Sequence, residues 1–571
     1  MKVLLLHPED RIPPGEPSSW NLIVDLARAP QTTYAAWRNR FGCEVISIYE
    51  FAEEIDDLEC LRKLLQTGIG ELRDGCGIDW WDVLGLELIG DLHRELLARR
   101  LASRLSPVCQ LYASRPHAMA LSVQNRLGVR LINLQSVIYS SIQRLQHFCQ
   151  QCSNLDSRQL LQIAEDKFGA FRMPVGAEAD RSKSDRPTIL CPSAYLNASR
   201  TVLAFAGRMP HTQFSLVYTR RSGKIYPLPS NVHQVPLAPY HIVPDRNELA
   251  MLLSSWDTLH KRLIGANDVF RNADSAGMLS RIPALLQWGI SLRDAWRGIF
   301  QSREFVGCLC TDDSNPPTRI PLILAKNKGL PCVVAHHGAL DYAMAFKQHV
   351  ADLYLAKSEM ERDYLLHRCR VAAEKVELHA GVDSELPEPR RSALRQLVFF
   401  TEPYQNFGRR RDEVYRELVP PLCHLARRMN LALVFKLHPF ESERGFRKML
   451  KRCAEDLHRE VCVTSGAITN DLWRSTKVAL TVQSSVAMEC RNRNIPVILC
   501  TWLRDPLSGY AGQFAKFGVG LSLTSPEEIG DIPQLLENYD DNSPVRGARA
   551  GSIRPLTELF CADPCPEYAV N

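Results

Sequence analysis

From Thr188 onward, short apolar runs alternate with longer stretches in which apolar residues recur at helical spacing. This alternation is typical of proteins in which crossover helices join parallel strands. The later half shows it most clearly, and its apolar runs predict strands at 397–400, 431–435, 461–464, 478–481 and 496–500. Helices are predicted between them at 412–428, interrupted at Pro420, and at 442–457. We therefore predict a complete Rossmann-like domain in this half.

The earlier half has a more interrupted series of apolar runs. Strands are predicted at 3–6, 44–48, 110–113, 130–132, 188–191, 214–218, 307–310 and 332–335, with long helical stretches near 81–104, 137–168 and 277–300. This pattern indicates one Rossmann-like core that carries helical insertions. Pro387 and Pro389 stand among charged residues at 381–391, which is typical of an exposed connection between domains.

The predicted fold class is therefore α/β, with two Rossmann-like domains that face each other across a cleft. The first domain covers 1–385, the second covers 392–540, and 541–571 form a tail. With 45% hydrophobic and 23% charged residues among 571, the chain has the composition of a globular protein. A net charge of only +5, without a basic stripe, argues against nucleic acid as a partner.

The chain's composition also bears on its compartment. No stretch reaches the roughly 18 uncharged apolar residues of a membrane span. The opening apolar run ends at His7 and predicts a strand, because it is too short for a signal peptide. Many of the 18 cysteines lie in strand-like runs, as buried thiols do, so we predict a cytoplasmic protein, with peripheral contact at the inner membrane surface left open. Cys149 and Cys152 lack the second pair that a structural zinc site needs, so no metal site is predicted.

The sharpest polar motif is Phe-Lys-Leu-His-Pro-Phe-Glu at 435–441. Lys436 and His438 emerge where a predicted strand ends, and Pro439 fixes the turn. Ligands of open α/β sheets bind at the carboxyl edge of the strands, and these side chains suit a phosphate. The alternative is a strand-ending turn whose polar residues have no ligand.

A second motif, at 481–490, leads from a strand through a polar turn into a helix. Ser484 and Ser485 stand at the predicted helix start, where hydroxyls and free amides can bind an anion. Glu489 follows about one turn later and can accept hydrogen bonds from ribose hydroxyls. The alternative is an ordinary serine cap followed by a stabilising glutamate.

Together, the Lys-x-His-Pro motif, the Ser-Ser-x-x-x-Glu motif and the Asn-Ile-Pro-Val-Ile run at 494–498 resemble the nucleotide-binding half of GT-B glycosyltransferases. The resemblance covers about 300–540 and is strongest to bacterial capsule and surface-polysaccharide transferases and to bacterial sialyltransferases. In those enzymes the His-Pro and Ser-Ser motifs hold a cytidine nucleotide, which implies a CMP-sugar donor. Teichoic-acid glycerophosphotransferases carry a similar pair of motifs and use CDP-glycerol, so the donor group stays open.

The resemblance also implies a general base in the earlier half. Bacterial sialyltransferases carry a paired acidic motif followed by Gly, and Asp312 and Asp313 match the pair, although Ser314 stands in place of the Gly. Asp313, further beyond the strand, is the preferred base and Asp312 the second candidate. The alternative is that one of them caps the helix led by Pro316.

A His-Gly turn after the next strand resembles one found widely among GT-B polysaccharide and teichoic-acid enzymes. His337 is the reserve base, and Gly338 lets the backbone approach a ligand closely. Tyr404 follows the first strand of the later half and is predicted to contact the base or sugar of the donor. The loop at 192–197 follows a strand as an acceptor-binding loop would.

We predict a glycosyltransferase that moves a sugar from a nucleotide donor to a surface polysaccharide or glycolipid, without a metal ion or cofactor. A helix N-terminus of the second domain, together with Lys436 and His438, would neutralise the donor phosphates in place of Mg²⁺. A CDP-glycerol-type glycerophosphotransferase and a non-catalytic nucleotide-sugar-binding protein of the same fold are the alternatives. A UDP-sugar epimerase would need acidic and basic groups around the sugar, which the sequence does not identify.

Overall fold

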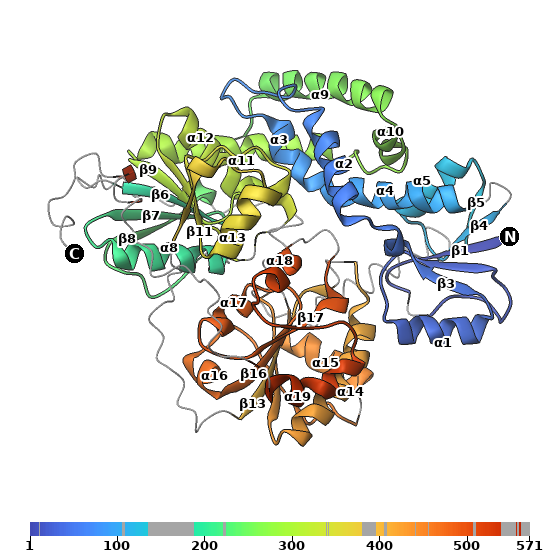
Figure 1. The fold of residues 1–571 in the computed structure, drawn as a ribbon. Coiled ribbons are helices and arrows are strands. Elements are labelled where there is room, and N and C mark those ends of the chain that lie inside the picture. The colour runs from blue at the N-terminus through green and yellow to red at the C-terminus, as the bar shows by residue number, and fades with distance from the viewer. Residues whose placement is uncertain are drawn as a thin grey trace.

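The computed structural model describes residues 1–134 without 11 and 106–108, 188–379 without 221–223, 242, 339 and 341, and 395–537 without 405–407, 440, 455 and 506–509, together with 539, 556, 559 and 560. The predicted connection at 381–391, the helical stretch at 137–168 and the Cys149–Cys152 pair lie outside these residues. Within them the chain forms three parallel sheets (Figure 1), which confirms the α/β class.

The first sheet has five strands in the order β3-β2-β1-β4-β5. Its strands are β1 (Lys2–Leu6), β2 (Leu22–Asp25), β3 (Glu44–Ser47), β4 (Gln110–Ala113) and β5 (Leu131–Asn133). Helices α1 (Gln31–Phe41) and α5 (Ala118–Leu127) belong to this part of the chain. The apolar positions of β1 are fully buried, as expected of a parallel strand covered on both faces.

The second sheet has seven strands in the order β12-β11-β10-β9-β6-β7-β8. They are β6 (Thr188–Ser193), β7 (Gln213–Tyr218), β8 (Val232–Pro236), β9 (Gly307–Cys310), β10 (Cys332–Val334), β11 (Leu353–Ala356) and β12 (Val376–Leu378). Its connections include α8 (Leu196–Arg208), α9 (Arg246–Ala266), α10 (Asp268–Ser275), α11 (Ile282–Ser302), α12 (Pro316–Asn327) and α13 (Glu359–Asp363).

The single core predicted for the first half is thus corrected, because its strands fall into two sheets. Apolar runs show where strands occur but not which strands pair, and β5 and β6 lie in different sheets although they are consecutive among the described strands. The prediction also missed β2, β8, β11 and β12. Of these, β8 and β12 are edge strands with polar residues in their sequences.

The third sheet has six strands in the order β15-β14-β13-β16-β17-β18. They are β13 (Gln396–Phe400), β14 (Ala432–Lys436), β15 (Val461–Thr464), β16 (Thr476–Thr481), β17 (Val497–Cys500) and β18 (Leu521–Leu523). Its helices are α14 (Arg411–Arg428), α15 (Glu443–Cys453), α16 (Asn470–Ser475), α17 (Val486–Arg491), α18 (Tyr510–Lys516) and α19 (Ile532–Glu537). Every strand predicted in this half is present, while α14 continues through Pro420 where an interruption was predicted. Buried Leu418, Val419 and Leu422 hold that part of the helix against the core.

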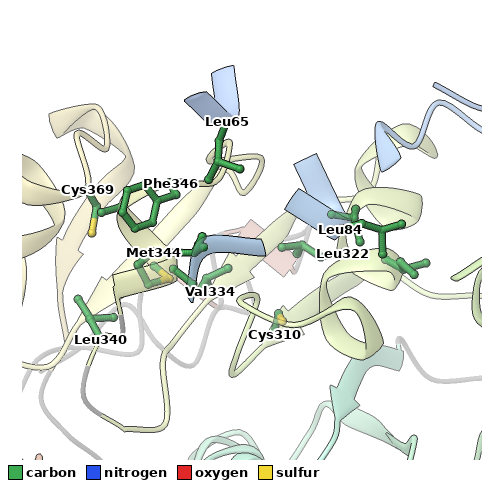
Figure 2. Packing of buried hydrophobic residues seen from close by; sticks show 14 of the residues in the cluster. Leu65, Leu84, Cys310, Leu322, Val334, Leu340, Met344, Phe346 and Cys369 are labelled. Atoms are coloured by element: carbon green, nitrogen blue, oxygen red, sulfur yellow. The ribbon is translucent and has the colours of Figure 1, made fainter. Parts of the chain in front are cut away.

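A helical layer joins the first two sheets. It includes α2 (Glu54–Gln66), α3 (Trp80–Leu84) and α4 (Ile89–Arg104), and in Figure 1 these lie beside α9, α10 and α11. Figure 2 shows Leu65 and Leu84 of this layer in the same cluster as Cys310 and Val334 of the second sheet. A Cβ atom on Gly289 of α11 would lie 2.4 Å from the buried Trp80 ring, so helix and ring pack without a gap. The helices that follow β3, α2 and α3, therefore complete the hydrophobic core of the second sheet.

The predicted tail is partly packed against the second sheet. Leu556 and Phe560 are buried in one apolar cluster with residues of β6 and β9. A Cβ atom on Gly307 of β9 would lie 2.3 Å from the Phe560 ring. Every helix of the described part of the chain is too short or too polar to cross a membrane.

Candidate active site

The strand order of the second sheet reverses between β6 and β9. Strands β7 and β8 follow on one side of this point and β10 to β12 on the other. In open α/β sheets the crevice at such a reversal is where ligands bind. The loops that leave β6, β9 and β10 at this edge carry Tyr195, Asp312, His336 and His337. The motif residues at 312 and 337, predicted from separate strand ends, are thus brought together.

Asp312 is the centre of this cluster. Its Oδ2 atom accepts hydrogen bonds from the Tyr195 hydroxyl and from Asn315 Nδ2 at 2.7 Å, and its Oδ1 accepts one from Ser314 N at 2.9 Å. His336 Nε2 lies 3.5 Å from Oδ1. Burial alone would raise the pKa of Asp312, but the hydrogen bond from His336 and the charges of both histidines hold that pKa below its usual range. Asp312 is therefore ionised, and its Ser314 contact also has the form of a local turn.

His337 has the geometry of an oriented base. Its Nδ1 atom lies 3.0 Å from the Thr311 carbonyl oxygen, so Nδ1 carries the proton and Nε2 is the basic nitrogen. The ring packs edge-on against Tyr195 at 4.9 Å and beside His336 at 5.1 Å. Burial, and then the charge of His336, lowers the pKa of His337 to about 4. The imidazole is thus neutral near pH 7 and able to accept a proton.

The neighbouring Gly338 leaves open space. A Cβ atom built on it would meet no atom within 4 Å, so close packing does not require glycine there. Its carbonyl oxygen accepts a hydrogen bond of 2.7 Å from Lys357 Nζ. A cation that follows β11 therefore contacts the turn that carries the two histidines.

Asp313, the preferred base in the sequence analysis, lies elsewhere, and its assignment is corrected. Its side chain is 0% exposed and forms an ion pair with the equally buried Lys347. Arg319 Nη1 lies 3.9 Å from its second oxygen, and the same guanidinium pairs with Asp82 of α3. Burial would raise the pKa of Asp313, but the Lys347 and Arg319 charges lower it. A carboxylate enclosed in this way holds the loop in place and cannot reach an acceptor hydroxyl.

The second group of predicted residues lies at the carboxyl edge of the third sheet. Strand β14 leads to Lys436 and His438, and β16 leads to Ser484, with β13 between them. Two strand spacings are about 9.5 Å, so both turns lie on one edge within reach of one ligand. The residues after β13 connect them, since Thr401 Oγ1 accepts a 2.9 Å bond from His438 N and Glu402 Oε1 accepts a 2.7 Å bond from Gln483 N. The strand order reverses between β13 and β16, and in open α/β sheets ligands bind at the carboxyl edge beside such a reversal.

The cations at this edge face the second sheet. Lys436 Nζ donates to the Gly466 and Leu437 carbonyl oxygens at 2.7 and 3.1 Å. Burial, together with the positive charge of Arg200 on α8, lowers the pKa of Lys436 to about 8. The pKa of His438 falls to about 4 through burial and the charge of Lys436. The positive charges of Lys436 and of Arg200 thus repel each other, and an anion bound near both would relieve this repulsion.

The helix that follows the Ser-Ser turn is short. Helix α17 has only six residues, so the helix-dipole part of the prediction is weak. Ser484 Oγ accepts a 3.3 Å bond from Val486 N, as in a local serine turn, while Ser485 at the N-cap position of α17 makes no side-chain capping bond. Pro439 lies in the turn after β14 and is exposed, whereas Glu489 lies within α17. The serine side chains themselves remain the groups that a phosphate could contact.

Tyr404, which was predicted to contact the base or sugar of the donor, is buried in the third sheet instead. Its ring is 1% exposed and packs edge-on against Tyr415 at 5.5 Å in the core of the third sheet. A residue four positions after a parallel strand can turn inward as easily as outward, and the pattern of the sequence did not distinguish the two. The sequence also missed Glu402 and Glu441, whose pKa values burial raises to about 7. Their positions directly after β13 and in the His-Pro turn were the available signal.

Within the described ranges no group of three or more His, Cys, Asp or Glu side chains is placed to hold a metal ion. No family profile matches the chain, and no curated protein matches it. Among solved structures, UDP-GlcNAc 2-epimerase from Methanocaldococcus jannaschii is similar, at 12% identity and a TM-score of 0.43, over 66% of this chain and 99% of that one.

MurG from Acinetobacter baumannii is similar at 9% identity and a TM-score of 0.35, over 62% of this chain and 90% of its own. The calicheamicin glycosyltransferase CalG4 is similar at 12% identity and a TM-score of 0.37, over 66% of this chain and 94% of its own. At these identities and TM-scores the likeness concerns the fold alone.

Proposed function

We propose that this protein transfers a sugar from a nucleotide donor to a hydroxyl group of a glycan or glycolipid, between the carboxyl edges of the second and third sheets. The observation that carries the proposal is the pair of edges itself. One edge holds an ionised carboxylate and a neutral, oriented histidine, and the other holds Lys436 and His438 opposite Arg200. The motif resemblance supports a cytidine nucleotide as the donor's head group and a surface polysaccharide as the acceptor.

In the proposed reaction His337 Nε2 takes the proton of the acceptor hydroxyl. The acceptor oxygen forms a bond to the anomeric carbon, and the bond from that carbon to the donor phosphate oxygen breaks. The Thr311 carbonyl oxygen holds the Nδ1–H of His337, and the nearby Asp312 carboxylate stabilises the imidazolium that forms. Asp312 can serve as the base itself where the acceptor lies on its side of the cluster.

The leaving nucleotide gains negative charge on its phosphate. Lys436 and Arg200 supply positive charge at that point, and the Ser484 and Ser485 hydroxyls supply hydrogen bonds. Lys436 keeps a third N–H donor beyond its two bonds to carbonyl oxygens. These groups would perform the charge neutralisation that other folds assign to a divalent cation.

Donor binding is tested by thermal unfolding with CMP, CDP, UDP and GDP. A ligand at 100 times its Kd stabilises the native state by about 2.7 kcal/mol, and we expect the largest effect from a cytidine nucleotide. Lys436→Met should abolish most of the shift, while Lys451→Met, which removes an exposed cation from α15 of the same sheet, should retain it. Equal shifts for both variants would contradict the proposed phosphate site.

Turnover is tested by release of nucleotide from CMP-sugar and CDP-glycerol in the presence of a polysaccharide acceptor. Loss of a general base costs roughly 10² to 10⁴ in rate, so His337→Gln should lose turnover and keep donor binding. Asp312→Asn separates the two candidate bases, and His367→Gln, at an exposed histidine, is the matched control. Turnover with CDP-glycerol alone would indicate phosphotransfer, and binding without turnover of any donor would indicate a non-catalytic protein.

A further inference from the structure

The first and third sheets are joined by a seam of contacts between their loops. The loop after β2 and the loop after β13 form a parallel bridge between Arg28 and Arg409. Arg28 N donates to the Gly408 carbonyl oxygen at 2.8 Å, and Arg410 N donates to the Arg28 carbonyl oxygen at 2.9 Å. The Arg410 guanidinium also forms a two-bond ion pair with the buried Asp25, at 2.5 and 2.8 Å. The geometry of this seam is therefore fixed by backbone and side chain together.

A cavity of about 520 Å³ opens within the seam. Its walls come from the ends of β2 and β3 in the first sheet and from the ends of β17 and β18 in the third. In Figure 1 these two sheets lie side by side, the first in blue and the third in orange to red. The volume lies within the roughly 300 to 1,000 Å³ of small-molecule sites.

Two arginines line the cavity, and the negative charge of Asp505 acts on both of them. Among the described residues neither the Arg28 nor the Arg409 guanidinium forms an ion pair, although each donates to backbone carbonyl oxygens of the loop at 502–504. Arg28 Nε and Nη2 and Arg409 Nε are buried and have no hydrogen-bond partner among the described residues. Buried, charged donors of this kind cost stability unless something pairs with them. Burial and the charge of Arg28 lower the pKa of Arg409 to about 10, which shows how closely the two cations are held.

The other walls suit a hydroxylated ring. Tyr49 lies under the Arg28 guanidinium, with 4.3 Å from the ring centroid to Cζ, and Trp502 also lines the cavity. Three carboxylates, those of Glu50, Glu417 and Glu527, also line it. Aromatic faces and carboxylates are the groups that hold the ring and the hydroxyls of a sugar, while guanidinium groups match the oxygens of a phosphate.

We infer that this cavity is a second ligand site, which binds a phosphorylated sugar with its phosphate on Arg28 and Arg409 and its hydroxyls on the carboxylate wall. The site uses no residue of the proposed donor site. Its ligand is a separate anionic saccharide, either a free sugar phosphate or the phosphorylated end of a longer glycan.

The test measures binding of glucose 6-phosphate to the full chain by titration calorimetry, with glucose and inorganic phosphate as partial probes. We expect glucose 6-phosphate to bind more tightly than either part. Arg28→Met should weaken it at least about tenfold, because it removes charged donors but keeps a long apolar side chain over Tyr49. Arg427→Met, which removes an exposed cation from α14 outside the cavity, is the control and should bind as the parent does.

A second variant covers the case in which Arg28→Met does not fold. Ser525→Trp places a bulky ring at the half-buried rim and leaves both arginines in place, so it should also abolish binding. Lys436→Met separates this site from the donor site, since it should bind glucose 6-phosphate normally. No binding by the parent protein, or equal binding by the parent and Ser525→Trp, would overturn the inference. A phosphorylated oligosaccharide that binds where glucose 6-phosphate also binds, but at least tenfold more tightly, would identify the glycan end as the ligand.

Discussion

Replacing Asp313 with Ala should destabilise the second sheet far more than it affects chemistry. The substitution leaves the Lys347 ammonium buried, with its side chain 0% exposed and its remaining near contact the Met344 sulfur at 2.6 Å. Removing one member of a buried ion pair costs about 3 to 5 kcal/mol, because the other charge stays in a medium that does not solvate it. Arg319 is affected less, since it keeps Asp82. We therefore expect a loss of about 3 to 5 kcal/mol in the free energy of unfolding.

The double variant Asp313→Ala/Lys347→Met gives the decisive comparison. Removing both charges takes away the uncompensated ammonium, so the double variant should be more stable than Asp313→Ala alone, with a coupling of about 1 to 3 kcal/mol. Urea unfolding followed by tryptophan fluorescence at pH 7 gives the midpoints. The pKa of Asp313 is depressed in the folded state, so its contribution is complete above the unfolded value of 3.8 and is lost as the pH falls below it.

The outcome that would contradict this reasoning is a stable variant without turnover. If Asp313→Ala unfolds at the parent's urea midpoint while its turnover collapses, Asp313 is a reacting group and the burial argument is wrong. If instead the single variant is unstable and Lys347→Met restores the midpoint, the carboxylate serves to hold the loop that presents Asp312. Turnover of the folded double variant then measures how much that positioning contributes.

Three further outcomes follow from the described contacts. Glu402 has a pKa of about 7 in the folded state, so its contribution to stability is complete below pH 4.5 and is lost as the pH rises through 7, by up to about 3 kcal/mol. Glu402→Gln removes this dependence, and the unfolding midpoints at pH 5 and pH 8 should differ less in the variant than in the parent. Gly289→Ala should cost about 1 to 3 kcal/mol through collision with Trp80, whereas Gly265→Ala, with open space around it, should not destabilise; equal urea midpoints would contradict this packing. Arg410→Met should cost about 3 to 5 kcal/mol by leaving its buried carboxylate partner in the first sheet unpaired, and limited proteolysis should then cut first at the seam; unchanged protection would show that the backbone bridge alone holds it.

Five of the six strands of the third sheet could be predicted from the sequence because they are continuous apolar runs, such as Leu433 to Phe435, separated by amphipathic helices. The short edge strand β18 was missed, since Leu521–Leu523 has a serine between its two leucines. The division of the first half could not, since pairing between parallel strands is set by packing of distant segments. Leu65 and Trp80 lie in sequence between β3 and β4 of the first sheet but pack on the second sheet. No local pattern records that choice.

The candidate site shows the same limit at the level of single residues. The sequence could place Asp312 and His337 at one sheet edge because both follow buried strands. The adjacent Asp313 was given the wrong role because its burial depends on Lys347, which stands 34 positions away, and on Arg319 in the next helix. Neighbouring residues on a loop point in different directions, and only their tertiary partners decide which one faces the ligand.

The three sheets also form a closed mechanical loop. The first part of the chain is tied to the second sheet through Asp82 and Arg319, the second to the third through Asp363 and Lys516, and the third back to the first through Arg410. A body in such a loop cannot rotate at one joint while the other joints stay fixed. Any rotation of the third sheet that brings Lys436 closer to the second sheet must therefore change the width of the seam around Arg28. By linkage, a donor bound between the second and third sheets and a ligand bound in the seam cavity change each other's binding free energy by the same amount.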